Sequence, residues 1–101
     1  MIKIGVFYPQ SKNFDWDYYL HKHTPMLHKL MSPALKKVDI EKGIAGGAPG
    51  TAATYQTICN LHFDSVAAFQ AALAPHAGEI MGDIANYTDA QPIIQIGEVK
   101  M

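Results

Sequence analysis

The chain has 101 residues, of which 49% are hydrophobic, and this is enough for a single domain, residues 1–101, with its own core. Its net charge is −1, and all eight basic residues are lysines spread along the chain, which argues against a nucleic-acid partner and an arginine clamp for phosphate or carboxylate. One cysteine, no signal-like N-terminus and no apolar run of membrane-spanning length predict a cytoplasmic protein without disulfides or membrane contact.

The first elements that the sequence predicts are a strand and an interrupted helix. β-forming residues run over 2–8. Asp15 is placed to cap a helix that begins at Trp16. Pro25 breaks the amide ladder of this helix, so we expect Thr24 to cap a second helical piece.

The middle of the chain predicts a hairpin. Apolar and charged residues alternate over 35–44, which indicates a strand with one solvent-exposed face. The glycine-rich stretch Gly43–Ala53 lacks the features of a phosphate-binding loop and is expected to be a mobile hairpin loop. A further strand is expected over Tyr55–Phe63, with its odd-numbered residues together on one face.

The last third predicts a second interrupted helix and a fourth strand. Asp64 is expected to cap the helix, which restarts after Pro75 and continues through Met81. Residues 92–99 form a strand apolar enough to be covered on both faces. The order βαββαβ predicts an α+β, ferredoxin-like fold, with a four-stranded antiparallel sheet and both helices on one face. A second sheet packed on the open face would give a dimeric α+β barrel, so we expect a homodimer.

Two histidines fall on the apolar stripes of the two helices. The first stripe consists of Trp16, Tyr19, Leu20, Leu27, Leu30 and Met31, and the second of Val66, Phe69, Leu73 and Ile80. His23 fills the vacant position of the first stripe and His76 that of the second. Because a buried imidazole needs a partner, we expect Asp17 or Asp83 to approach His23. A structural histidine that donates to a backbone carbonyl is the alternative.

Other kinds of site find less support in the sequence. His21, His23 and His28 do not provide the i, i+4 pair that helical metal ligands favour, so we expect no metal. Burial in mid-strand would raise the pKa of Cys59 and make it a poor nucleophile, and Ser65 is expected at a helix start. No cofactor motif is present, so we expect no cofactor.

Two segments of the chain, DYYLHKHTPML (17–27) and HAGEIMGDIANYTDAQPIIQIGEV (76–99), resemble the EthD family of dimeric α+β-barrel proteins. The residues that carry the resemblance most clearly are Tyr18 and Tyr19 ahead of His23 and Pro25, and the turn from Asp83 to Tyr87. The resemblance implies a ferredoxin-like homodimer with a pocket between helices and sheet, as in muconolactone isomerases and cofactor-free quinone-forming monooxygenases. It does not imply one reaction, since the family name comes from an accessory protein of an oxygenase system that degrades ethyl tert-butyl ether, and other members resemble cyclases or dehydratases.

The residues in such a pocket suggest a cofactor-free lyase, isomerase or cyclase acting on a small apolar or aromatic carbonyl compound. His23 would be the base that removes a proton α to the carbonyl, and Tyr18, Tyr19 or Tyr55 would donate to the enolate oxygen. The residues expected to contact the ligand are Trp16, Tyr19, Tyr55, Phe69, His76 and Met81. One alternative is a non-catalytic ligand-binding or oxygenase-accessory protein. Another is a purely structural dimer whose interior is filled by Trp16, Tyr19 and Phe69.

Overall fold

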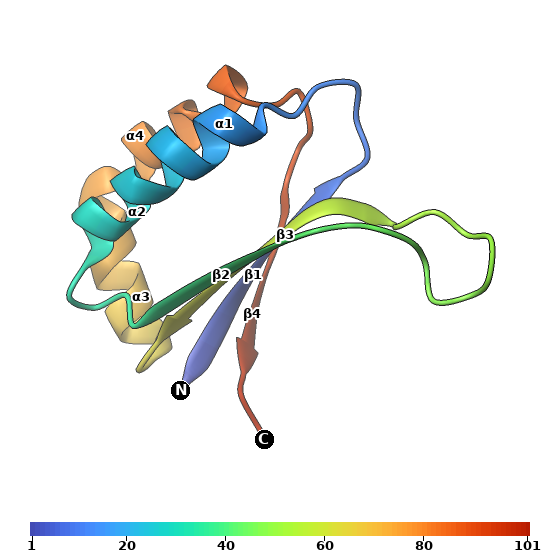
Figure 1. Cartoon of the computed structure of the whole chain (residues 1–101). Coiled ribbons are helices and arrows are strands. Elements are labelled where there is room, and N and C mark those ends of the chain that lie inside the picture. Colours follow the sequence, from blue (N-terminus) through green and yellow to red (C-terminus); the bar gives the residue numbers. More distant parts are fainter.

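The computed structural model describes residues 1–101 as one four-stranded sheet with a layer of helices on one face (Figure 1). The strands are β1 (Ile2–Pro9), β2 (Lys37–Lys42), β3 (Tyr55–Phe63) and β4 (Ile93–Glu98). Their order is β2-β3-β1-β4, and every neighbouring pair is antiparallel. The predicted ferredoxin-like α+β fold is confirmed, although β2 is shorter than the stretch 35–44 expected from its alternation.

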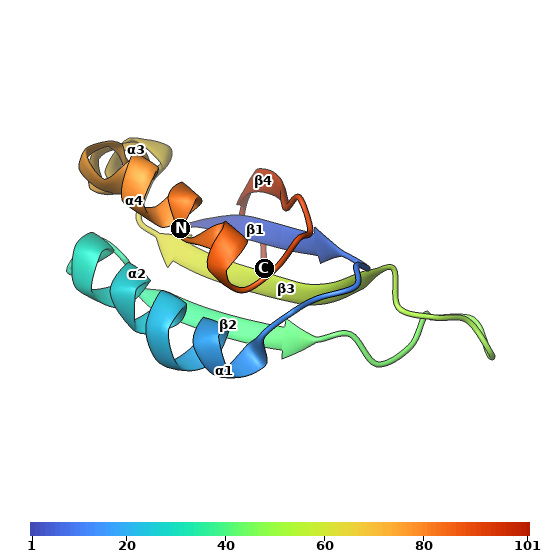
Figure 2. The ribbon, with the colours of Figure 1, turned by 90° about the horizontal axis from the view of Figure 1, so that it is seen from above.

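The helical layer contains two interrupted segments that cover the same face of the sheet (Figures 1 and 2). The α-helices are α1 (Trp16–Tyr18), α2 (Thr24–Met31), α3 (Val66–Leu73) and α4 (Ala77–Gly82). A π-helical turn, Tyr19–His23, joins α1 to α2, and 3₁₀ turns lie at Ala74–His76 and Ile84–Asn86. No helix is both long and apolar enough to cross a membrane.

The first helical segment runs on through Pro25, so the expected cap at Thr24 is wrong. Both His23 and Thr24 have helical backbone angles. The Thr24 hydroxyl instead donates to the Tyr19 carbonyl at 2.9 Å, and the Thr24 amide also bonds to this carbonyl. Since proline supplies no amide hydrogen, a widened turn just before Pro25 accommodates it without ending the helix.

The second helical segment begins one residue later than expected. Ser65, rather than Asp64, is the N-cap of α3: its backbone is extended and its hydroxyl accepts from the Ala68 amide at 3.1 Å. Asp64 remains exposed, with its carboxylate 3.9 Å from the Lys36 ammonium. The expected helix start at Ser65 is confirmed.

The core lies between the sheet and the helices. Its buried apolar side chains come from β1, β3 and both helical segments and include Ile4, Phe63, Leu27, Met31 and Phe69. The opposite face of the sheet carries no helix (Figure 1). Because side chains alternate between the two faces of a strand, the residues buried under the helices are also those that can reach the site.

The edge strand β4 differs from the expectation that both its faces are covered. Ile93, Ile94 and Ile96 remain 52%, 47% and 44% exposed within one chain. Beyond β2 and β3, the predicted loop Gly43–Ala53 extends away from the body of the fold (Figure 2). Gly50 in this loop has φ +78°, a conformation that side chains with a Cβ adopt rarely. The homodimer remains a prediction.

Candidate functional site

His23 lies in the π-helical turn with its side chain almost fully enclosed, at 3% exposure. It faces the core because it occupies the vacant position of the apolar stripe. Tyr19, one turn earlier, stacks on its ring at 5.7 Å between ring centroids. Tyr87 packs on the ring from the other helical segment at 4.7 Å. The imidazole is thereby held in one orientation by aromatic neighbours.

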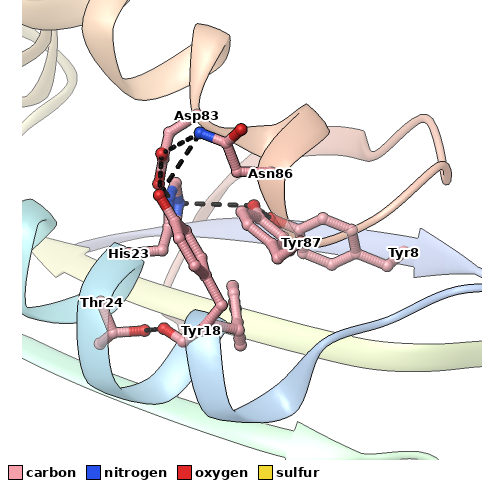
Figure 3. Close-up of polar contacts among 8 residues, drawn as sticks. Tyr8, Tyr18, His23, Thr24, Asp83, Asn86 and Tyr87 are labelled. Atoms are coloured by element: carbon pink, nitrogen blue, oxygen red, sulfur yellow. Dashed lines mark hydrogen bonds and ion pairs between the residues drawn. The ribbon is translucent and has the colours of Figure 1, made fainter.

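Asp83, which follows α4, is the charge partner of His23 (Figure 3). Its Oδ2 lies 2.9 Å from His23 Nδ1. Its other oxygen, Oδ1, accepts from the Tyr18 hydroxyl at 2.6 Å and from the Asn86 amide at 2.9 Å. Three donors therefore converge on one carboxylate, and together they connect the two helical segments.

The second ring nitrogen of His23 faces a pair of tyrosine hydroxyls (Figure 3). His23 Nε2 lies 3.4 Å from the Tyr87 hydroxyl, and that hydroxyl lies 2.7 Å from the hydroxyl of Tyr8 on β1. An ionised carboxylate can only accept, so Nδ1 carries the hydrogen toward Asp83 and Nε2 presents its lone pair. At 3.4 Å the bond to Tyr87 is long and weak.

Burial and hydrogen bonding together set the protonation states in this cluster. It lowers the pKa of His23 below its ordinary value, and this effect outweighs the hydrogen bond to Asp83, which acts in the opposite direction. Burial also works to raise the pKa of Asp83, but the hydrogen bonds from Tyr18, Asn86 and His23 outweigh it and keep this pKa below its usual range. Burial raises the pKa of Tyr8 to about 12. At neutral pH the cluster therefore contains a neutral imidazole, a carboxylate and protonated phenols.

An apolar cavity of about 70 Å³ lies beside His23, between the helices and the sheet. Its walls are formed by Ile4, Val6, Tyr8, Tyr19, His23, Leu27, Met31, Cys59, Leu61, Phe69, Leu73, Ile80, Met81, Ile84, Pro92 and Ile94. His23 is the only basic side chain among them, and no carboxylate lines the space. Because a void remains, the alternative of an interior completely filled by Trp16, Tyr19 and Phe69 is wrong.

The structure brings only some of the residues expected at the site to this cavity. Tyr19, Phe69, Met81 and His23 line it. Trp16 and His76 do not. Trp16 is half-buried against Phe14, with 4.9 Å between ring centroids, and His76 is half-buried in a 3₁₀ turn. Tyr18 contacts the carboxylate of Asp83 and does not line the cavity, whereas Asp17 is exposed.

Tyr55 lies away from the cavity because the register of β3 is irregular. Tyr8 pairs with Thr57 but Pro9 pairs with Tyr55, so Gln56 is an extra residue in this strand. The irregularity reverses the alternation and places Tyr55 against Phe7, at 5.2 Å between ring centroids, on the face opposite Tyr8. The prediction that Tyr55 shares a face with Thr57 and Cys59 is therefore wrong.

Several residues of the site were not among those expected from the sequence. Tyr8, Tyr87 and Asn86 complete the polar cluster. Tyr8 could have been found from the alternation of β1, which places it on the same face as Ile4. Cys59 behaves as expected, since burial raises the pKa of its thiol to about 11. No three His, Cys, Asp or Glu side chains are grouped as metal ligands.

The fold and the site define a ferredoxin-like α+β protein whose apolar cavity adjoins a buried histidine paired with a partly buried aspartate. The EthD domain family model matches residues 8–91. An EthD-like protein from Ralstonia eutropha JMP134 is 41% identical, with a TM-score of 0.93 over 99% of this chain and 92% of that chain. The chain belongs to the EthD family.

More distant solved structures share the fold. SnoaB from Streptomyces nogalater, described as a cofactor-independent oxygenase, is 9% identical, with a TM-score of 0.59 over 99% of this chain and 92% of that chain. A dimeric ferredoxin-like protein from an uncultured marine organism is 12% identical, with a TM-score of 0.55 over 100% and 96%. No curated protein matches the sequence.

The lowered pKa of His23 predicts acid sensitivity of the fold. Below the ordinary histidine pKa of about 6.5, the unfolded chain binds a proton that the buried ring in the folded protein resists, so the free energy of unfolding falls as the pH decreases. Asp83 adds a loss at still lower pH, as the pH falls through its lowered pKa. Urea unfolding should show stability decreasing from about pH 7 to about pH 5, and His23→Gln should flatten this dependence.

The matched control for this experiment is His21→Gln, because His21 is exposed in the same turn. This variant should keep the pH dependence of the wild type. An undiminished slope in His23→Gln would show that His23 is not the group responsible.

Proposed function

We propose that this protein catalyses proton transfer without a cofactor, as a lyase, isomerase or cyclase acting on a small apolar or aromatic carbonyl compound. The observation that carries the proposal is the position of His23, the only basic side chain in an apolar cavity wall, with Nδ1 bound to Asp83. A neutral imidazole with an unprotonated Nε2 is the form required of a general base. The surrounding apolar wall suits an apolar or aromatic ligand.

The proposed step is removal of a proton α to the carbonyl. The Nε2 lone pair of His23 accepts the proton, the electrons of the C–H bond form a C=C bond, and the carbonyl π electrons move onto oxygen as an enolate. Asp83 keeps its hydrogen bond to Nδ1 and stabilises the imidazolium that forms. If the proton returns to another carbon, the substrate is isomerised. In a lyase reaction the enolate collapses as a leaving group departs from the neighbouring carbon, and His23 returns the proton to that group. In a cyclase reaction the enolate carbon attacks a second carbonyl carbon of the substrate, and His23 returns the proton to the alkoxide that forms.

Tyr8 is the donor that we assign to the enolate oxygen. It lines the cavity, and its pKa of about 12 keeps its hydroxyl protonated at neutral pH. The Tyr18 hydroxyl already donates its hydrogen to Asp83, and Tyr55 lies on the other face of the sheet. The Tyr8 hydroxyl lies 2.7 Å from that of Tyr87, and either of the two can be the donor. A substrate can replace the weak contact of Tyr87 with Nε2 at small cost, and Tyr87 can then donate to Tyr8, which leaves the Tyr8 hydrogen for the enolate oxygen.

A non-catalytic role, as a ligand carrier or as an accessory to an oxygenase, is the second candidate. Both ring nitrogens of His23 contact a neighbouring side chain, and the ring is buried. These features suit a residue that anchors a ligand as well as they suit a base. The homodimer is likewise proposed. It is supported by the exposed isoleucines of β4 and by the resemblance in fold to a dimeric protein.

Replacing His23 tests the catalytic proposal. With benzylacetone in D₂O, the wild type should exchange the protons α to the carbonyl for deuterium, as followed by NMR. His23→Gln should lower this rate about 100-fold or more, because the general base is removed. His28→Gln is the control, since His28 is exposed on α2, and it should leave the rate unchanged. Binding without exchange in the wild type would favour the non-catalytic role.

Replacing Tyr8 tests its assignment as the donor. Tyr8→Phe removes one hydroxyl from the cavity and should lower kcat for the same exchange about 100-fold with little change in KM, since the bond to oxygen strengthens as charge develops. Tyr55→Phe makes the same chemical change on the other face of the sheet and should leave kcat within about twofold. Equal losses in the two variants, or a change confined to KM, would contradict the assignment.

A further inference from the structure

A second hollow, of about 350 Å³, adjoins the cavity that contains His23. It shares three wall residues with that cavity: Met81, Ile84 and Pro92. The rest of its wall comes from the segment that leads from the last 3₁₀ turn to β4: Ala85, Thr88, Asp89, Ala90 and Gln91. The two spaces are therefore neighbours along one segment of chain.

Met81 lies at the junction between the two spaces and is 46% exposed. Its side chain is unbranched and has three rotatable bonds, so it can change rotamer at low cost. The wall shared by the cavity and the second hollow therefore contains a flexible and partly exposed side chain.

The two spaces differ in polarity. Four of the eight residues around the second hollow are hydrophobic, compared with fourteen of sixteen around the cavity. The Thr88 hydroxyl is occupied, since it donates to the Asn13 carbonyl at 2.7 Å. Gln91 is exposed and makes no side-chain hydrogen bond within the chain. Polar contacts for a ligand thus come mainly from Gln91 and Asp89.

Asp89 gives the second hollow a negative charge. Its Oδ1 accepts from the Asn13 amide at 3.2 Å. A hydrogen bond from Ser11 leads the causes that keep the pKa of this carboxyl below its usual range, so it is ionised at neutral pH. No lysine lines either space to balance this charge. An anionic group placed here would meet repulsion, whereas a hydroxyl would find acceptors.

We propose that the second hollow is the outer part of the same binding site, and that the ligand is an elongated molecule with an uncharged hydroxyl at the end remote from its apolar, carbonyl-bearing part. The apolar part occupies the cavity beside His23 and Tyr8. The hydroxyl donates to Asp89 or Gln91, and ligands with a carboxylate or phosphate at that end are rejected. The placement of the carbonyl rests on the proposed function, whereas the preference at the outer end rests on the second hollow alone.

Three probes that share one carbon frame test the preference: benzylacetone, its para-hydroxy derivative and its para-carboxy derivative. NMR titration of the isotope-labelled protein gives the affinity of each and the amides that shift. The para-hydroxy derivative should bind at least about threefold more tightly than the para-carboxy derivative and should shift the amides of residues 88–91. Asp89→Asn should improve binding of the para-carboxy derivative at least about threefold, because the like charge is removed.

Two further variants keep the result interpretable. Asp64→Asn removes an exposed acid that lines neither space and should not alter the preference. Gln91→Glu adds a negative charge to the hollow and should weaken the binding of the para-carboxy derivative further. Equal affinity for the para-hydroxy and the para-carboxy derivative, or shifts confined to the cavity walls, would overturn this proposal. Absence of α-proton exchange with the preference intact would overturn the proposed catalysis instead.

Discussion

The hydrogen bond between His23 and Asp83 is the interaction on which the architecture of the site depends. It joins residues 60 positions apart and connects the π-helical turn of the first helical segment to the end of the second. A buried imidazole without a partner would be costly, and a buried carboxylate still more so. Tyr18 and Asn86 satisfy the remaining oxygen of Asp83, so the carboxylate stays ionised and the ring stays neutral. This bond thus settles the tautomer of the histidine and connects the two helical segments.

Aromatic packing gives that bond its rigid setting. Tyr19 and Tyr87 both pack against the His23 ring, and they contact each other at 4.9 Å between ring centroids. Tyr8 contacts Tyr87 through its hydroxyl and so links the cluster to the central strand β1. Tyrosines lose little conformational entropy for the area that they bury, and each offers a hydroxyl at its end. The cavity beside His23 therefore has walls that hold polar groups at fixed positions in apolar surroundings.

The sequence was sufficient for the fold and for the position of the histidine, because both follow from local periodicity. The apolar stripe predicts His23 as the polar residue on the buried side of its helix. The sequence offers Asp17 and Asp83 as its partner, and the structure selects Asp83. Tyr87 and Asn86 could not be assigned in this way, since their contacts depend on how the two helical segments pack. Tyr55 was misplaced because one extra residue, Gln56, shifts the register of β3, and alternation alone does not reveal such a residue. Trp16 and His76 show the same limit: a helical stripe indicates the buried side of a helix but not which part of it meets a cavity.

The most direct test of this account is the tautomer and charge of His23, measured by two-bond ¹H–¹⁵N correlation NMR with assignment from His23→Gln. At neutral pH the account predicts a neutral ring with hydrogen on Nδ1 and an unprotonated Nε2, and Asp83→Asn should weaken this preference. Such a ring has its lone pair available on the side of Tyr8 and Tyr87. A protonated imidazolium at neutral pH, or a ring with its hydrogen on Nε2, would contradict the account, because Nε2 could then not accept a proton.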